Sequence, residues 1–320
     1  MQILTPELQQ EIKSKGALLA VLIALFVVFS FLSSFSPTKS AATVSTTLQA
    51  GTGEIASGDY KSRVAFVSDE VNPAKGIRTK IILGDAVPQM VADGIIDIDK
   101  IKALYQDRGG IPPEKMKMLT QPSNTPLTIN ADNATWLVNI LWPLGLANKM
   151  EVNNQSPIAG ASVDGYASTG GWSLGKANTG GGYFNKYSLV PLTPAQEQRV
   201  LQIAQNTYRP CCDNSSFFQD CNHGSAAMGI IELGVSQGLS DGDIYQTLLA
   251  FNSFWFPQNY VETALYFNIV KGVDWKDVDP KIILGKDYSS LSGWTKNVNA
   301  PIQKVSGLIP KTQSGASCGT

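Results

Sequence analysis

The chain has 320 residues, of which 43% are hydrophobic and 16% are charged, and its formal net charge at pH 7 is −1. Such a composition is that of a globular protein able to bury one large core or two modest ones. Because there is no basic surplus to neutralise phosphates, the sequence argues against a nucleic-acid-binding protein.

The N-terminal region predicts the compartment. An apolar run at 17–35 carries no charged residue, and it is long enough to cross the hydrocarbon core of a bilayer. We predict an uncleaved transmembrane anchor over residues 16–36, because the run exceeds the usual apolar core of a signal peptide. Lys13 and Lys15 precede it, which favours a cytoplasmic N-terminus (1–15) and an extracytoplasmic remainder. The expected localisation is the cell membrane, with a single pass through the lipid bilayer at 16–36.

The middle of the chain is expected to combine a linker with a small mixed region. Residues 37–58, rich in Ser, Thr, Ala and Gly, are typical of a flexible linker. Residues 59–190 are predicted to form a small mixed α+β region, because apolar patterns at 62–71 and 78–84 are typical of strands and capped helical patterns follow. The Gly-rich part at 151–186 has no helical periodicity, and loops of this length are usually functional or disordered. It is therefore a candidate surface for a protein partner.

Helical signals become strong from Thr193 onward. Thr193 and Gln196 form a capping-box pattern, and Ser240 precedes a second capped segment. We predict a three- to four-helix bundle over residues 191–275, followed by a C-terminal extension at 276–320. The expected fold class is therefore mainly α, with an N-terminal transmembrane helix, a tether, the small mixed α+β region and this C-terminal bundle.

Three of the four cysteines and the only histidine lie in one stretch of the predicted bundle, PCCDNSSFFQDCNHG at 210–224. The candidate metal ligands in it are Cys211, Cys212, Cys221 and His223. Three thiolates and an imidazole are a donor set of structural zinc sites, and soft sulfur also suits Cu(I). The stretch falls between two predicted helices, and the start of the second would help to keep thiolates charged. Cys318, in the C-terminal tail, is a further candidate ligand.

Disulfide bonding is the alternative that needs no metal. An exported domain usually oxidises its cysteines. Adjacent residues lie too close at Cα for an unstrained disulfide, so Cys221 would bond to Cys211 or Cys212, and Cys318 to the other. This interpretation makes the domain a stapled scaffold or a partner-binding ectodomain.

The segment from Arg209 to Asn222 resembles the periplasmic cytochrome c maturation subunits that handle apocytochrome thiols. Their motif runs Arg-Cys-x-x-Cys-Gln-Asn-Gln-Ser-x-x-Asp-Ser-Asn, and a helix and a Ser-Asp-x-x-Ile helix start follow in a three-helix bundle. The matching positions, with one inserted residue, are Cys212, Asn214, Ser216, Asp220, Asn222, Ser240, Asp241 and Ile244. The family's first reactive cysteine falls at Arg209, and its serine becomes Cys221. The resemblance implies thiol redox chemistry, which needs an attacking and a resolving thiol.

A second resemblance favours metal. The pattern Pro-Cys-Cys with a downstream Asp-Cys is similar to bacterial lipoproteins that carry a Pro-Cys-Tyr-Cys-Gly-Cys motif and are thought to bind metal. The matching residues, without the intervening Tyr and Gly, are Pro210, Cys211, Cys212, Asp220 and Cys221. Either resemblance covers about 60 of the 320 residues.

The function predicted from these observations is that of a membrane-anchored extracytoplasmic protein that binds Zn²⁺ or Cu(I) through its Cys/His cluster, in a structural or carrier role. A thiol–disulfide redox protein and a disulfide-stapled, partner-binding ectodomain are the alternatives. We assign no catalytic residue, because the only histidine lies in the cluster and leaves no base for a Ser-His-Asp triad. Dinucleotide- and nucleotide-binding motifs are absent from the sequence.

Overall fold

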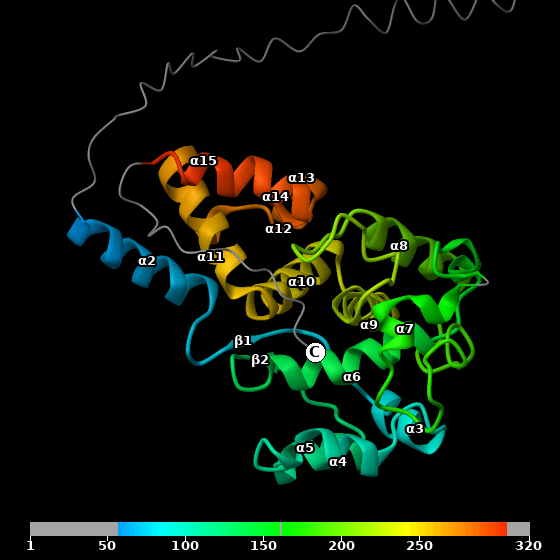
Figure 1. Cartoon of the computed structure of the whole chain (residues 1–320). Coiled ribbons are helices and arrows are strands. Elements are labelled where there is room, and N and C mark those ends of the chain that lie inside the picture. The colour runs from blue at the N-terminus through cyan, green and yellow to red at the C-terminus, as the bar shows by residue number, and fades with distance from the viewer. Residues whose placement is uncertain (1–56, 161, 306–320) are drawn as a thin grey trace, which may run out of the picture. The chain divides into compact units, whose positions relative to one another are not determined.

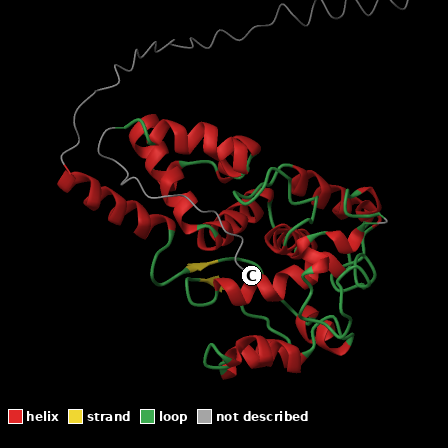
Figure 2. Ribbon diagram, in the orientation of Figure 1, coloured by secondary structure: helices red, strands yellow, loops and turns green. Residues whose placement is uncertain are grey.

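The computed structural model describes residues 57–160 and 162–305, and this part of the chain is mainly helical (Figures 1 and 2). The α-helices are α2 (Ser57–Val71), α3 (Ala86–Ala92), α4 (Ile98–Gln106), α5 (Pro113–Thr120), α6 (Ala134–Ala147), α7 (Ala167–Gly170), α8 (Pro194–Gln205), α9 (Asn222–Ser236), α10 (Asp241–Trp255), α11 (Pro257–Tyr266), α12 (Pro280–Ile283), α13 (Lys286–Ser289), α14 (Leu291–Trp294) and α15 (Ala300–Ile302). Shorter 3-10 or π turns are η1 (Glu151–Gln155), η2 (Val163–Gly165), η3 (Phe267–Lys271), η4 (Trp275–Asp277) and η5 (Thr295–Asn299).

The sheet of the described residues is one small antiparallel pair, drawn in yellow in Figure 2. Strand β1 (Ile77–Arg78) pairs with β2 (Thr128–Ile129), with Ile77 opposite Ile129. The segment after β1 continues along its partner through single hydrogen bonds, such as that from the Leu127 amide to the Ile81 carbonyl (2.8 Å). It then turns into α3, so the sheet does not grow.

The prediction of a mixed α+β region over residues 59–190 is therefore wrong. Residues 62–71, expected to be a strand, belong to α2, which packs beside α11 (Figure 1). The reason is visible in the spacing of its valines: Val64, Val67 and Val71 recur three and four residues apart and share one helical face. Val67 and Val71 are buried, whereas Phe66, on another face, is 59% exposed.

The membrane part of the fold-class prediction is also corrected for the described residues. Within 57–160 and 162–305, no helix has both the length and the apolar character that crossing a bilayer requires. The predicted N-terminal segment 1–15, the anchor at 16–36 and the tether lie outside the described residues, except for residues 57 and 58, which begin α2. The described chain is thus a helical protein with one minimal strand pair.

The centre of the fold is the contact between α6 and α9, which lie against each other along their length. Both helices are apolar, and α6 continues through Pro143 to Ala147. Small residues let their backbones approach: a Cβ added at Gly145 would overlap the Ser225 carbonyl oxygen, and one added at Gly229 would lie 2.7 Å from the Leu141 carbonyl oxygen. Because α6 comes from the predicted mixed region and α9 from the predicted bundle, the two regions share one hydrophobic core.

The Gly-rich segment at 151–186 packs on this core rather than projecting from it; residue 161 within it is not described. Its Trp172 and Tyr183 are buried, and the Trp172 ring meets that of Trp142 on α6 edge-on at 5.1 Å. The Trp142 indole N–H donates to the Ser168 carbonyl (2.8 Å). These contacts fix the segment beside α6 and the start of α9, where the candidate site lies.

Replacement of Gly145 by alanine tests the close approach of α6 to α9. We expect Gly145→Ala to lower the free energy of unfolding by about 1–3 kcal/mol, since the new methyl group meets backbone that cannot rotate away. Gly182→Ala is the matched control, because a Cβ there has nothing within 4 Å. Denaturant titration of both variants gives the comparison, and equal stability of the two would contradict this account of the interface.

Candidate functional site

Cys211, Cys212 and Cys221 lie in the loop that joins α8 to α9, as the sequence predicted. The predicted capping box of Thr193 and Gln196 starts α8. Cys221 is the N-cap of α9, and its sulfur accepts a hydrogen bond from the Gly224 amide (3.4 Å). The last cysteine of the loop is therefore held at the positive end of a 15-residue helix.

The three sulfur atoms lie within 4.8 Å of one another, close enough to hold a metal ion. The sulfurs of Cys211 and Cys221 are 3.8 Å apart, and none of the three described cysteines is in a disulfide. The structure thus brings together three of the four predicted ligands. Cys318, the further candidate, lies outside the described residues.

Arg209 is buried inside the loop between α8 and α9 and donates hydrogen bonds to it. Its side chain is only 1% exposed. Its guanidinium donates to the Cys221 sulfur (3.2 Å), to the Asn214 carbonyl (2.8 Å) and to the Asp220 carboxylate. Asn214 also donates its side-chain amide to Asp220 (2.9 Å). One buried cation therefore links both ends of the loop and directs an N–H group at a sulfur.

Gly224 makes room for this guanidinium. A Cβ at position 224 would lie 2.7 Å from Cζ of Arg209, so a larger residue would displace the guanidinium or the start of α9. From the sequence, Arg209 is notable only as the position of the missing cysteine, and the packing of Gly224 against its guanidinium is not predicted. The available signal was weak, because a lone arginine beside an apolar segment is ordinarily expected at the surface.

Segments far away in the sequence hold the loop from outside. The Ser168 amide, in α7, donates to the Asp220 carbonyl (3.2 Å). On the other side, the Leu291 amide donates to the Cys212 carbonyl (2.9 Å), and the Ser292 amide to the Asp213 carboxylate (2.7 Å). The predicted C-terminal extension thus contributes α14 to the support of the cysteines.

The three thiols differ in the direction in which their surroundings shift the pKa. Hydrogen bonding with the Cys211 and Cys212 sulfurs holds the pKa of Cys221 well below its usual value; burial opposes this, and Arg209 adds to it. Hydrogen bonding to the other two sulfurs and burial raise the pKa of Cys211. For Cys212, the contact with Cys211 lowers the pKa, but Cys221 and burial outweigh it and bring the pKa to about 11. Cys221 is therefore the thiol of the group that ionises most readily.

His223 is not part of the group that could hold a metal ion, which among the described residues consists of the three cysteines. Its ring packs against the rings of Phe256 (4.7 Å between centroids) and Trp255 (5.5 Å). Burial lowers the pKa of His223, which favours the neutral imidazole at pH 7. Its assignment as a fourth ligand stays a prediction.

A pocket of about 550 Å³ opens beside Cys221. Cys221 is the only one of the three cysteines that lines it. The ring-bearing residues in its wall are Trp142, His223, Phe254, Trp255 and Phe256. Asn222 also lines it, and the side-chain oxygen of Asn222 is buried without a hydrogen-bond partner in the described structure.

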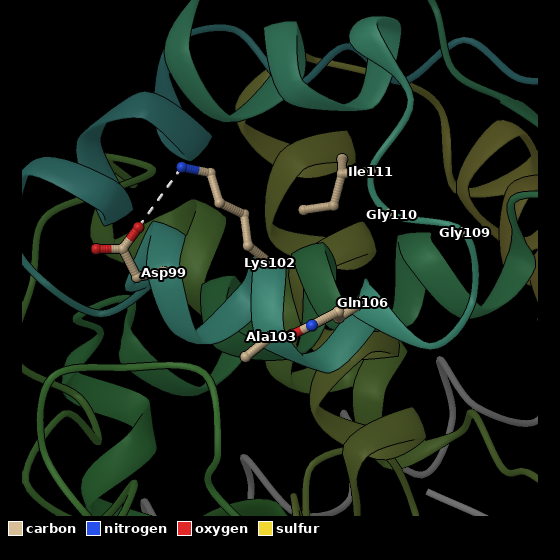
Figure 3. Close-up of a pocket in the computed structure, with 7 residues that line it drawn as sticks. All are labelled: Asp99, Lys102, Ala103, Gln106, Gly109, Gly110 and Ile111. Atoms are coloured by element: carbon tan, nitrogen blue, oxygen red, sulfur yellow. Dashed lines mark hydrogen bonds and ion pairs between the residues drawn. The ribbon is translucent and has the colours of Figure 1, made fainter.

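A second pocket, of about 540 Å³, lies at α4 (Figure 3). Lys102 and Asp99 point toward each other there, 3.5 Å apart, and Gly109 and Gly110 end the segment with positive φ angles. Neither a cysteine nor a histidine is among its seven lining residues. Asp97 is the N-cap of α4 and Asp99 lies in its first turn, so both carboxylates stand at the positive end of the helix.

The charge state of Cys221 can be measured by alkylation. We expect iodoacetamide to modify Cys221 of the reduced chain readily at about pH 6.5, where an ordinary thiol of pKa ~8.5 is only about 1% thiolate. Arg209→Lys should raise the pKa of Cys221 and slow this reaction by roughly tenfold, since lysine lacks the planar fork that contacts the sulfur.

Arg199→Lys is the matched control, because Arg199 pairs with Asp241 rather than with the cysteine loop. Peptide mapping after alkylation over a range of pH values gives the profile of each cysteine, and thermal unfolding shows whether each variant is folded. A Cys221 profile that coincides with that of the denatured chain would contradict the assignment.

Comparison of the chain with protein-family models, with curated proteins and with solved structures finds no match. The resemblance to cytochrome c maturation subunits therefore stays a prediction.

Proposed function

We propose that this chain binds one soft metal ion, Cu(I) in preference to Zn²⁺, through the sulfurs of Cys211, Cys212 and Cys221. The observation that carries the proposal is the spacing of these atoms. Metal–sulfur bonds of about 2.3 Å place the sulfurs of a tetrahedral or trigonal site about 3.8–4.0 Å apart. The 3.8 Å between Cys211 and Cys221, and the 4.8 Å limit on all three pairs, are close to that range.

The number of donors favours Cu(I). Zinc in proteins is almost always four-coordinate, so three sulfurs leave one of its positions open. Soft thiolates alone satisfy Cu(I). The arrangement around the sulfurs supports either ion, because Arg209 and the start of α9 offset the negative charge of the thiolates. A carrier role fits the position of Cys221 on a pocket better than a purely structural one, since structural sites are closed.

Metal titration of the reduced full chain tests the proposal. Anaerobic competition with a Cu(I)-specific chromogenic chelator should give about one Cu(I) per chain, tighter than Zn²⁺. Cys212→Ser and Cys221→Ser should each abolish tight binding, whereas Cys318→Ser should leave it unchanged. Binding should weaken as the pH falls, because the metal must displace thiol protons.

His223→Ala separates the three-sulfur site from the four-donor site of the sequence analysis. Unchanged Cu(I) affinity is expected for three sulfurs, and loss of affinity would restore His223 as a ligand. The variant with all three loop cysteines replaced by serine sets the background. A wild-type chain that binds no more metal than this background would overturn the proposal, and an absence of free thiols in it would leave the stapled-scaffold alternative.

A second candidate function is thiol–disulfide exchange, and the position of Cys221 favours it. A thiolate at a helix N-terminus and beside an arginine is the arrangement of reactive cysteines. Cys211 lies 3.8 Å from Cys221 and supplies the resolving thiol that such chemistry needs. The predicted relation to thiol-handling subunits points the same way.

Equilibration of the reduced chain with glutathione buffers tests this second function. We expect a disulfide between Cys211 and Cys221 to form reversibly, with Cys212 remaining a thiol. Chymotrypsin cuts after Phe218 and separates Cys221 from the other two, and fragmentation of the linked peptides between Cys211 and Cys212 in a mass spectrometer identifies the bonded cysteine. Cys212→Ser should preserve the transition, whereas Cys211→Ser should leave Cys221 as a mixed disulfide with glutathione. If no reversible disulfide forms in the folded chain, the second candidate is excluded.

A further inference from the structure

We infer that the pocket beside Cys221 is a binding site for a small, ring-bearing disulfide or thiol that carries no positive charge, and that Cys221 is the sulfur with which such a ligand exchanges. The inference deepens the second candidate function and rests on it. It names the class of substrate, about which the sequence is silent.

Only one of the three clustered sulfurs is within reach of a ligand in the pocket. Cys221 lines the pocket, whereas Cys211 and Cys212 do not. A ligand in the pocket therefore meets Cys221 first, and the Cys211 sulfur follows at 3.8 Å. This order is the one that exchange requires, with the attacking sulfur in contact with the ligand and the resolving sulfur behind it.

The wall of the pocket is rich in aromatic rings. Rings from α6, α9 and α10, together with that of Phe256, the C-cap of α10, form one part of its lining. The indole N–H groups of Trp142 and Trp255 are already bonded, to the carbonyls of Ser168 (2.8 Å) and Ala134 (3.2 Å). These rings are therefore fixed and offer apolar surface, which suits an aromatic ligand.

The wall of the pocket carries few charged side chains. No carboxylate lines the pocket. Apart from Cys221, its only charged lining residue is Arg108, an exposed residue whose guanidinium lies 5.9 Å from the Tyr105 ring centroid. A cationic ligand would thus find no counter-ion other than the Cys221 sulfur with which it would exchange. The buried oxygen of Asn222 can accept one N–H or O–H group, which gives an otherwise apolar ligand a polar anchor.

The exchange step balances with the groups named. The Cys221 thiolate attacks one sulfur of the ligand disulfide; the new bond joins Cys221 to that sulfur, and the other half leaves as a thiolate. The Cys211 thiol then loses its proton to solvent and attacks the Cys221 sulfur, which forms the Cys211–Cys221 disulfide and releases the second half. The protein is oxidised by two electrons, and the ligand disulfide is reduced to two thiols.

Alkyl methanethiosulfonates test the preference, because they share one leaving group and differ only in the group that they transfer. The probes are benzyl, 2-hydroxyethyl and 2-aminoethyl methanethiosulfonate, which transfer an aromatic, a neutral polar and a cationic group. The rate of modification of Cys221 in the reduced full chain carrying Cys318→Ser is measured with each, and the denatured chain gives the intrinsic ratios. We expect the folded chain to favour the benzyl reagent over both others, relative to the denatured chain, by about tenfold.

Phe256→Leu is the variant that tests the wall, since it removes a ring but keeps an apolar side chain. It should reduce the benzyl preference by about three- to tenfold without changing the rate of the hydroxyethyl reagent. Phe66→Leu is its control, because Phe66 is exposed on α2 and does not line the pocket. Ratios equal to those of the denatured chain would overturn the inference.

The outcomes separate this inference from the function on which it rests. If Cys221 reacts with all three reagents without preference and Cys211 then releases the transferred group, exchange stands and the pocket assignment fails. If the benzyl preference holds but the mixed disulfide persists, the pocket stands and exchange fails. If Cys221 of the folded chain reacts with none of the reagents while the denatured chain does, both are overturned.

Discussion

The contact between the buried Arg209 guanidinium, the Asp220 carboxylate and the Cys221 sulfur is the constraint on which the site depends. A buried cation is costly unless it is paired and its N–H groups are bonded. The loop between α8 and α9 meets this requirement by folding around the arginine, and the path that it takes gathers the three cysteines. The glycine at position 224 is part of the same solution, because α9 must begin where the guanidinium lies.

The rest of the described fold supports this loop. The close packing of α6 against α9 fixes the helix that Cys221 caps, and it depends on two glycines, Gly145 and Gly229. The segment at 151–186 then covers one side of the loop through Ser168, and α14 covers the other. The cysteines are therefore held from several directions, which favours a preorganised site over a flexible tail of ligands.

The two functions that we propose draw on the same physical feature, a cluster of soft sulfurs in which the pKa of Cys221 is lowered and those of Cys211 and Cys212 are raised. A metal would take all three, whereas exchange would use Cys221 and Cys211 and leave Cys212 aside. The side of Cys221 that faces the pocket matters to both proposed functions. It admits a further donor to a metal, or a disulfide to the thiolate, and the aromatic wall selects what can reach it.

The sequence by itself determined the features that depend on neighbours within a turn or two. The caps at Thr193 and Ser240 and the position of the cysteine loop between two helices are in the structure as predicted. Only the tertiary structure decided that α2 is a helix, that His223 packs on aromatic rings and that Arg209 is buried among sulfurs. These depend on contacts between residues far apart in the chain, such as Val71 with the core or Ser168 with Asp220. Local periodicity and spacing carry no record of such contacts, because the free energy that selects them comes from burial in the assembled core.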